Sequence, residues 1–141
     1  VMQILQGLAK TLMKYQDPQS GTWYQVTDQG AREGNYLESS ATALFIYTLA
    51  KAVNKGYISK DYIEPTRKAF DGMVKTFTRL EEDGSYTITN CCAVAGLGGD
   101  SKRYRDGSFE YYISEPVIEN DPKSVGSFIL AAIEYEKMTD K

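Results

Sequence analysis

The sequence predicts an all-α fold of two helical hairpins, with short β-hairpins in the long links. Three observations lead to this prediction: helical segments with one apolar stripe alternate with segments that are apolar on all sides, short and long links alternate between them, and a weak repeat follows the first and third segments. The chain has 141 residues, 42% of them hydrophobic and 25% charged, which suits one globular domain over residues 1–141.

The first and third helical segments, at about 1–15 and 60–80, each carry one apolar stripe opposite a polar face. Asp17-Pro18 should end the first, because the residue before a proline avoids helical geometry. Ser59 is the expected N-cap of the third. Both segments should lie on the outside of the domain and pack through their stripes: Ile4, Leu5, Leu8, Leu12 and Met13 in the first, Ile63, Phe70, Met73, Val74 and Phe77 in the third.

The second and fourth segments, at about 36–54 and 122–138, are apolar around the whole circumference. Lys55-Gly56 is expected to end the second. Asp121 should cap the fourth, with Pro122 in its first helical position. Both segments are therefore predicted to be enclosed, and more buried than the first and third. Their apolar residues include Leu44, Phe45, Ile46 and Leu49 in the second, and Val125, Phe128, Ile129, Leu130 and Ile133 in the fourth.

The links predict where function lies. The link at 55–59 is short, whereas those at 17–35 and 81–120 are long and rich in Gly and aromatic residues. Each long link contains a Gly turn followed by a short β-prone run. Since successive links of antiparallel helices lie at alternate ends, both long links should share one end of the domain.

Charge and hydropathy argue against two classes of partner. The net charge is −3, and no Lys/Arg-rich run is present to neutralise phosphates, so we expect no nucleic-acid partner. The apolar stretches near 41–52 and 125–133 are too short to cross a bilayer, so we expect no membrane partner. Residues 1–5 already lie within an amphipathic pattern, without an initiator Met or a signal peptide. We therefore expect a cut inside a larger protein, whose localisation the sequence leaves unknown.

Residue content also limits the chemistry. The chain contains no His, and its two cysteines, Cys91 and Cys92, are adjacent. Adjacent cysteines rarely bridge and lack the spacing of metal ligands, so they should be small buried residues. We therefore expect no metal and no other cofactor. Without His, a Ser-His-Asp or Cys-His nucleophile cannot be assembled from this chain alone.

Five stretches stand in a recognisable order: Gly21–Val26, Gly34–Ala41, Cys92–Gly99, Tyr104–Glu115 and Asn120–Lys123. Together they resemble the unsaturated rhamnogalacturonyl hydrolases of glycoside hydrolase family 105, which are related to the family 88 unsaturated glucuronyl hydrolases. The resemblance covers nearly the whole chain. It implies that the chain is the C-terminal part of an (α/α)6 toroid, a barrel of six helical hairpins, which periodicity alone does not indicate.

The resemblance implies a bacterial enzyme that removes unsaturated uronic acid from pectin-derived, rhamnogalacturonan-type oligosaccharides. In this family an Asp protonates the C4=C5 double bond, water adds at C5, and the resulting hemiketal collapses to release the neighbouring sugar. The family's catalytic Asp and its Trp-Ala-Arg-Gly-Asn-Gly-Trp motif belong to earlier hairpins and are absent from this sequence. No catalytic residue is therefore assigned to this chain, and we expect the chain alone to be inactive.

Two stretches could contact the oligosaccharide through the backbone. Glu38, Ser39 and Ser40 open an enclosed helix, where N–H groups and hydroxyls meet a carboxylate or a sugar oxygen. Alternatively, Glu38 is a first-turn acid favoured by the helix dipole, and the serines allow close helix packing. Gly98 and Gly99 lie in a Gly-rich turn that is either a nest of N–H donors for the uronate or a plain tight turn.

The remaining candidates for substrate binding act through side chains. Arg105 either pairs with Asp106 to shape the loop or grips a carboxylate. Lys123 is either a solvated first-turn residue or a substrate contact. Four aromatic residues either stack on a sugar ring or pack on the barrel: Trp23, Tyr24, Tyr111 and Tyr112.

Two other functions stay open: a non-catalytic sugar-binding or structural α-hairpin module, and a helical-repeat scaffold for protein partners. The position of the aromatics on links rather than on helix faces argues against the scaffold. Cutting a barrel open would uncover apolar strips on the enclosed helices, so we expect self-association by two-fold pairing of two arcs. A compact four-helix domain is the alternative, and it would bury Leu44, Phe45, Phe128 and Ile129 within one chain.

Overall fold

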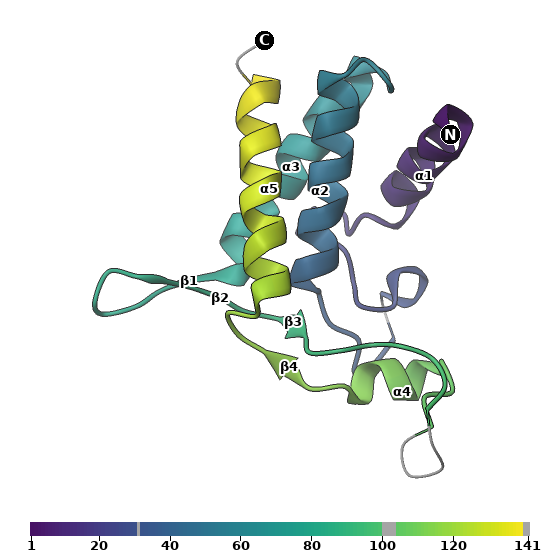
Figure 1. Cartoon of the computed structure of the whole chain (residues 1–141), viewed down its shortest axis with the longest axis vertical. Coiled ribbons are helices and arrows are strands. Elements are labelled where there is room, and N and C mark those ends of the chain that lie inside the picture. Colours follow the sequence, from purple (N-terminus) through teal and green to yellow (C-terminus); the bar gives the residue numbers. More distant parts are fainter. Residues whose placement is uncertain (31, 100–103, 140–141) are drawn as a thin grey trace.

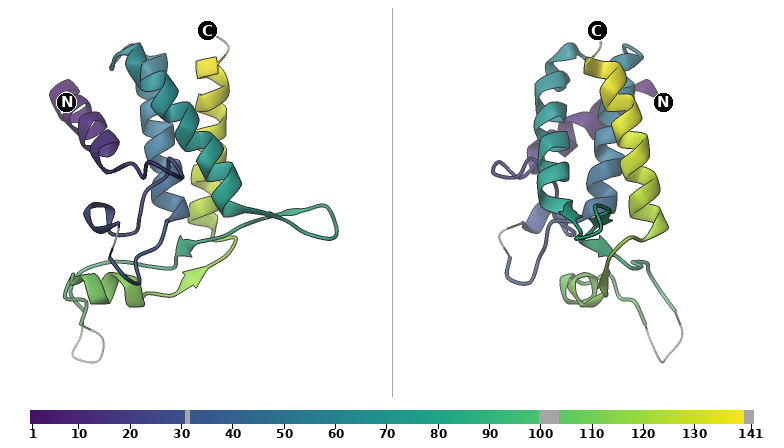
Figure 2. Two further views of the ribbon diagram at one scale, coloured as in Figure 1. Left: turned by 180° about the vertical axis from the view of Figure 1, so that it is seen from behind. Right: turned by 90° about the vertical axis from the view of Figure 1, so that its left-hand side faces the viewer.

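The computed structural model describes residues 1–30, 32–99 and 104–139, and four long helices dominate it (Figure 1). Helices α2, α3 and α5 stand side by side, and α1 leans away from them next to α2 (Figures 1 and 2). The fold is mostly helical with short β-hairpins, as expected for part of an α/α toroid. The bounds of the helices are Met2–Tyr15 for α1, Ser39–Asn54 for α2, Ile63–Phe77 for α3 and Pro122–Thr139 for α5.

Helix α2 begins at Ser39, later than predicted, because Glu38 is its N-cap. The Glu38 backbone is extended, and its side chain accepts a hydrogen bond from the Ala41 N–H. Leu37, just before it, is paired with Tyr24 in an isolated antiparallel β-bridge. The chain therefore enters α2 from an extended segment, without a preceding helical turn.

The other helix ends follow the predicted signals. Helix α1 ends just before Asp17-Pro18. Gly56 follows the end of α2 with a φ of 69°, which glycine adopts without strain. Ser59 caps a short 3-10 helix, η2 (Lys60–Tyr62), that leads into α3. Residues 78–80 were predicted as the end of the third helix, but they form a strand.

Two small antiparallel sheets lie in the second long link. Strand β1 (Thr78–Leu80) pairs with β2 (Tyr86–Ile88), and β3 (Cys91–Cys92) pairs with β4 (Val117–Ile118). The hairpin predicted in this link is thereby confirmed. In the first long link, the described residues form no strand, and η1 (Thr27–Gln29) and the Tyr24–Leu37 bridge stand in its place.

The second link also contains a short helix that was not predicted, α4 (Phe109–Ser114), whose N-cap is Ser108. After β4, Asn120 adopts a left-handed backbone with a φ of 51°. Its N–H donates to the Ile88 carbonyl at 2.8 Å, and its Oδ1 accepts from the Ile88 N–H, also at 2.8 Å. Asn120 thus fastens the end of the link to β2.

Both long links lie at the same end of the helices, as predicted (Figure 1). We call this end the rim; it consists of the described residues of 16–38 and 78–121. The β1–β2 hairpin projects from one side of the rim, and α4 lies on the other side, at the part of the rim farthest from the long helices (Figure 1). The rim is therefore the region in which the predicted site residues come together.

Burial is greatest in α2, whose Ile46 and Leu49 are completely enclosed. Only Ala9 and Leu12 of α1 are buried, in keeping with its predicted outer position. The predicted enclosure of α2 holds for half of its 16 residues, and Leu44 is 44% exposed.

The predicted enclosure of α5 is wrong for this chain. Its buried residues follow one stripe only: Ser124, Ser127, Ala131, Glu134 and Met138. Ile129, Leu130 and Ile133 are 56%, 44% and 44% exposed. The physical reason is that α5 packs along α2 and α3, and no described part of the chain covers its remaining face.

Candidate functional site

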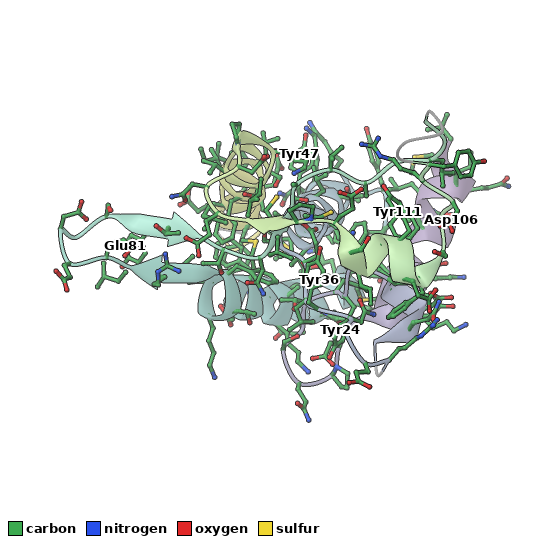
Figure 3. All side chains as sticks on the ribbon, turned by 90° about the horizontal axis from the view of Figure 1, so that it is seen from below. Tyr24, Tyr36, Tyr47, Glu81, Asp106 and Tyr111 are labelled. Carbon is green, nitrogen blue, oxygen red and sulfur yellow. The ribbon has the colours of Figure 1, made fainter. Side chains whose placement is uncertain are left out.

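The rim gathers several tyrosines at one end of the molecule. Figure 3, which views this end, shows Tyr36 lying between Tyr24 and Tyr111, with Asp106 farther out. These residues come from both long links. The rim therefore brings together parts of the chain that are far apart in the sequence.

Glu38 is the central polar residue of the rim, with 1% of its surface exposed. Its carboxyl group accepts hydrogen bonds from the Ala41 N–H at 2.7 Å, the Cys92 N–H at 3.0 Å and the Ser40 hydroxyl at 2.9 Å. The bond to Cys92 joins the start of α2 to β3. Glu38 is thus a helix cap that also holds the second long link in place.

This arrangement decides between the two roles expected for the start of α2. The Glu38 carboxyl group occupies the position that a ligand's carboxylate was expected to take. Ser40 is 8% exposed and donates to Glu38, and Ser39 is completely buried. At the start of α5 a carboxylate of the chain likewise takes the place of a ligand, since Asp121 accepts a hydrogen bond from the Lys123 N–H at 2.8 Å. Direct sugar contacts by these residues are therefore not supported.

Trp23 is also corrected by the structure. It has no exposed surface, it contacts Phe45 edge-on with ring centres 5.4 Å apart, and its Nε1 donates to the Leu12 carbonyl at 2.8 Å. It is a core residue and cannot stack on a sugar. Its neighbour Tyr24, on the opposite side of this extended segment, is half-buried and faces the rim.

Of the two alternatives for the Gly-rich turn, the structure supports a tight turn over an open nest of N–H donors. The Gly98 N–H donates to the Arg105 carbonyl at 2.9 Å, and the Gly96 N–H donates to the Tyr111 hydroxyl at 3.0 Å. Gly98 and Gly99 both have positive φ, at 77° and 125°. The turn instead closes the loop that precedes α4, and the Gly98 N–H is not available to a uronate.

Arg105 does not pair with Asp106. Its Nε lies 3.9 Å from a carboxylate oxygen of Glu115, whose side chain is completely buried, while Asp106 accepts from the Ser108 N–H at 2.8 Å. Sequence reasoning missed Glu115 as a site residue, and only its place after the tyrosines of α4 could have indicated it. Desolvation raises the pKa of the Tyr111 hydroxyl, and the nearby Glu115 raises it further.

Tyr36 is a second residue that sequence reasoning missed. Burial raises the pKa of its hydroxyl, and the Cys92 thiol and Glu38 beside it add to the rise. Burial likewise raises the pKa of Cys92. Tyr36 therefore keeps its proton and belongs to the buried polar layer around Glu38.

Lys123 holds β3 against the start of α5. Its ammonium group lies 3.1 Å from Cys91 Sγ, 2.8 Å from the Cys92 carbonyl oxygen and 3.2 Å from an Asp121 carboxylate oxygen. Burial would lower the pKa of Lys123, but the contacts with Cys91 and Asp121 outweigh it and raise the pKa. Its partners are thus part of the chain itself, and its side chain, which is 43% exposed, also keeps contact with solvent as a first-turn residue.

Three candidate aromatics keep surface at the rim: Tyr24, Tyr111 and Tyr112 are half-buried. The rings of Tyr111 and Tyr112 are tilted against each other, with centres 5.1 Å apart. Tyr24 lines a groove of about 350 Å³ beside the end of α1. A larger groove, of about 700 Å³, lies along α3 away from these tyrosines and is lined mostly by charged side chains.

The described ranges contain no cluster of three or more His, Cys, Asp or Glu residues that could hold a metal ion. Among the helices in the described part of the chain, none combines the length and apolar character needed to traverse a bilayer.

Among the curated relatives that match the chain are Protein Atu3128 of Agrobacterium fabrum and the 24.9 kDa protein in picA locus of Rhizobium radiobacter. Each is 39% identical over 120 residues, which is 82% of this chain and 52% of the relative. The chain thus spans about half the length of these relatives.

Solved structures of glycoside hydrolases share the fold. A family 105 glycoside hydrolase of C. acetobutylicum is 44% identical, with a TM-score of 0.92 over 96% of this chain and 37% of that chain. Possible members of family GH105 from Klebsiella pneumoniae and Salmonella enterica are 26% and 27% identical, with TM-scores of 0.76 and 0.77. Those two matches cover 99% of this chain and 31% and 32% of the others.

The family model described as Glycosyl Hydrolase Family 88 matches residues 1–139, nearly the whole chain. The helical hairpins, the paired long links at one rim and the similarity to solved family 105 structures agree with this match. The chain belongs to glycosyl hydrolase family 88.

Proposed function

We propose that the chain is the C-terminal part of an (α/α)6 barrel enzyme that removes unsaturated uronic acid from rhamnogalacturonan-type oligosaccharides. The observation that carries the proposal is the family match over residues 1–139. The TM-score of 0.92 to a family 105 glycoside hydrolase, of which the match covers 37%, supports a larger barrel around this arc.

The reaction would be a hydration. An acid outside this chain adds a proton to C4 of the C4=C5 double bond, and water adds its oxygen to C5 and loses a proton to a base. The hemiketal formed at C5 then opens to a ketone as the bond between C5 and the ring oxygen breaks, which leaves a hemiacetal at C1. That hemiacetal collapses to an aldehyde, and the glycosidic bond breaks to release the neighbouring sugar with its hydroxyl restored. No group of this chain is assigned to either proton transfer, because the sequence contains no His and its central carboxyl group, Glu38, is committed to backbone N–H groups.

This chain would supply part of the wall of the site. The half-buried Tyr24, Tyr111 and Tyr112 offer ring faces and hydroxyls to a sugar, and the buried layer around Glu38 keeps their segments in place. Preformed walls matter because holding the reacting sugar in position accounts for much of an enzyme's rate.

The test compares the 141-residue chain with a longer protein that contains it, on an unsaturated galacturonyl-rhamnose disaccharide. Loss of the absorbance of the conjugated double bond measures hydration directly. We expect turnover on the order of 1–10³ s⁻¹ from the longer protein and none from the chain alone, because general acid catalysis is worth about 10²–10⁴-fold. A longer protein that binds the disaccharide without turnover would support the non-catalytic module instead, and turnover by the chain alone would show that it contains the acid.

A further inference from the structure

A groove at the edge of the rim is distinct from the layer around Glu38. It lies where α1 meets the first long link, has a volume of about 350 Å³ and is lined by Lys14, Tyr15, Tyr24, Thr27 and Asp28, together with the backbone of the first link. This volume falls at the small end of the range for ligand pockets, roughly 300–1,000 Å³. Tyr24 lies at the same end of the molecule as Tyr36 and Tyr111 (Figure 3).

Two residues that line the groove, Gln16 and Asp17, are held in place by hydrogen bonds. The Gln16 side-chain amide donates to the Gly21 carbonyl at 2.8 Å and to the Pro65 carbonyl at 3.0 Å, which ties the link to α3. Asp17 accepts from the Ser20 N–H at 2.7 Å and from its hydroxyl at 2.8 Å. A groove whose lining is fixed in this way loses little conformational entropy when a ligand binds.

The ring of Tyr24 is held from one side. A Cβ placed on Gly30 would lie 2.8 Å from Cδ2 and 2.9 Å from Cε2 of Tyr24, so the Gly30 backbone lies directly against the ring. The Tyr24 backbone is fixed as well, by its β-bridge to Leu37. Tyr24 therefore presents its remaining surface to the groove in one orientation.

The polar groups of the groove have hydrogen-bonding capacity to spare. Within the described ranges, the hydroxyls of Tyr15, Tyr24 and Thr27 and the carboxylate of Asp28 make no hydrogen bond. Lys14 lies over the Tyr15 ring, 4.8 Å from its centre. The groove thus combines one accessible ring, Tyr24, with several hydroxyls, one carboxylate and one amine.

This combination selects a class of ligand. A tyrosine ring suits the apolar face of a pyranose, and hydroxyls and a carboxylate suit its hydroxyl groups. A uronate is disfavoured, because Asp17 and Asp28 both line the groove and the amine of Lys14 is already over a ring. The preferred ligand is therefore a neutral sugar.

We propose that the groove formed by Tyr24, Asp28 and the end of α1 is a binding site for a neutral pyranose. The proposal rests on the proposed function only in taking the ligand to be a saccharide.

The test is a titration of the 141-residue chain with methyl β-D-galactopyranoside, followed by the backbone amide signals in NMR spectra. We expect the signals of Tyr24, Thr27 and Gly30 to shift, with a dissociation constant in the millimolar range, and sodium D-galacturonate to bind more weakly. Tyr24→Ala should weaken binding roughly two- to tenfold, the range for loss of one aromatic contact. Tyr57→Ala is the matched control, because Tyr57 is 45% exposed at the opposite end of α2 and should leave binding unchanged.

Asp28→Asn is a second variant whose effect on binding cannot come from loss of folding, because Asp28 is exposed and its replacement leaves the core intact. It should weaken binding of the neutral probe about two- to fivefold, as expected for one charged hydrogen-bond acceptor. Shifts confined to other parts of the chain, no shift at all, or equal binding by the Tyr24→Ala and Tyr57→Ala variants would overturn the proposal, as would tighter binding of galacturonate. Hydration of the unsaturated disaccharide by a longer protein is a separate measurement, so failure of either proposal leaves the other standing.

Discussion

Replacing Glu38 by Gln should destabilise the chain although the two side chains have nearly the same shape. The carboxyl group of Glu38 receives hydrogen bonds from the N–H of Ala41 on one oxygen and the N–H of Cys92 on the other. A Gln side chain keeps one oxygen and brings an NH2 group to the other position. One backbone N–H would then face a donor in a buried place.

The magnitude follows from these contacts. A buried polar group left without its partner costs about 1–3 kcal/mol, and loss of a helix N-cap costs about 0.5–2 kcal/mol. Glu38→Gln loses one of the two N–H bonds, so we expect a decrease in the free energy of unfolding of about 2–3 kcal/mol. Glu38→Ala loses both and leaves a cavity, so its decrease should be about 3–5 kcal/mol. For a chain of this size, each kcal/mol corresponds to roughly 3–4 °C in the unfolding midpoint.

Thermal and urea unfolding followed by circular dichroism measures these differences. Glu33→Gln is the matched control, because Glu33 is exposed in the same link, and its change should stay within about 0.5 kcal/mol of the parent. If Glu38→Gln were as stable as Glu33→Gln, Glu38 would not bridge α2 and β3 as described, and the account of the rim would have to be abandoned.

Three further predictions concern packing, pH and association. Gly72→Ala places a Cβ 1.8 Å from the Ser20 carbonyl oxygen, so it should lower the free energy of unfolding by about 1–3 kcal/mol. Gly7→Ala has open space around the new Cβ within a helix, so it should raise the free energy of unfolding by about 0.5–1 kcal/mol. Equal urea midpoints for the two variants would contradict this prediction. The Lys123 N–H lowers the pKa of Asp121 from its ordinary 3.8, so the folded state binds this proton less readily than the unfolded state. The stabilisation is therefore present above about pH 4 and is lost as the pH falls through the lowered folded pKa. Asp121→Asn should lower the unfolding midpoint more at about pH 7 than at about pH 2. Finally, the exposed Ile129 and Ile133 should make the chain associate. Light scattering should then give a mass above 15.8 kDa that rises with protein concentration, and the Ile133→Lys variant should give a lower mass. A mass that stays at 15.8 kDa at every concentration would refute association.

The four long helices were predictable because apolar periodicity and cap residues are local signals. Asp17-Pro18, Gly56 and Ser59 each act within a few residues of themselves, and the structure uses all three. The burial of α5 was not predictable in this way. Apolar residues on all sides of a helix indicate that the helix can be enclosed, but the segments that enclose it need not belong to the same stretch of chain.

The site was predictable in part. The shared end of the two long links followed from antiparallel packing and was confirmed. The sequence could not predict that Glu38 joins α2 to β3, because one of its hydrogen-bond donors, the N–H of Cys92, lies far along the chain. Trp23 and Tyr24 are adjacent in an extended segment, where neighbouring side chains point to opposite faces. The two rings therefore could not both face a sugar at the rim.

The link from Asn120 to Ile88 also bears on aggregation. A two-stranded hairpin that projects from a protein exposes strand edges, and such edges can recruit a strand from another molecule. Asn120 takes both the N–H and the carbonyl of Ile88, so the outer edge of β2 offers no hydrogen-bonding site there. At the other end of the hairpin, the turn carries Glu82 and Asp83, whose like charges repel a second copy, while the charge of Glu81 is paired with Arg79. The protruding hairpin is therefore protected at both ends against growth into an intermolecular sheet.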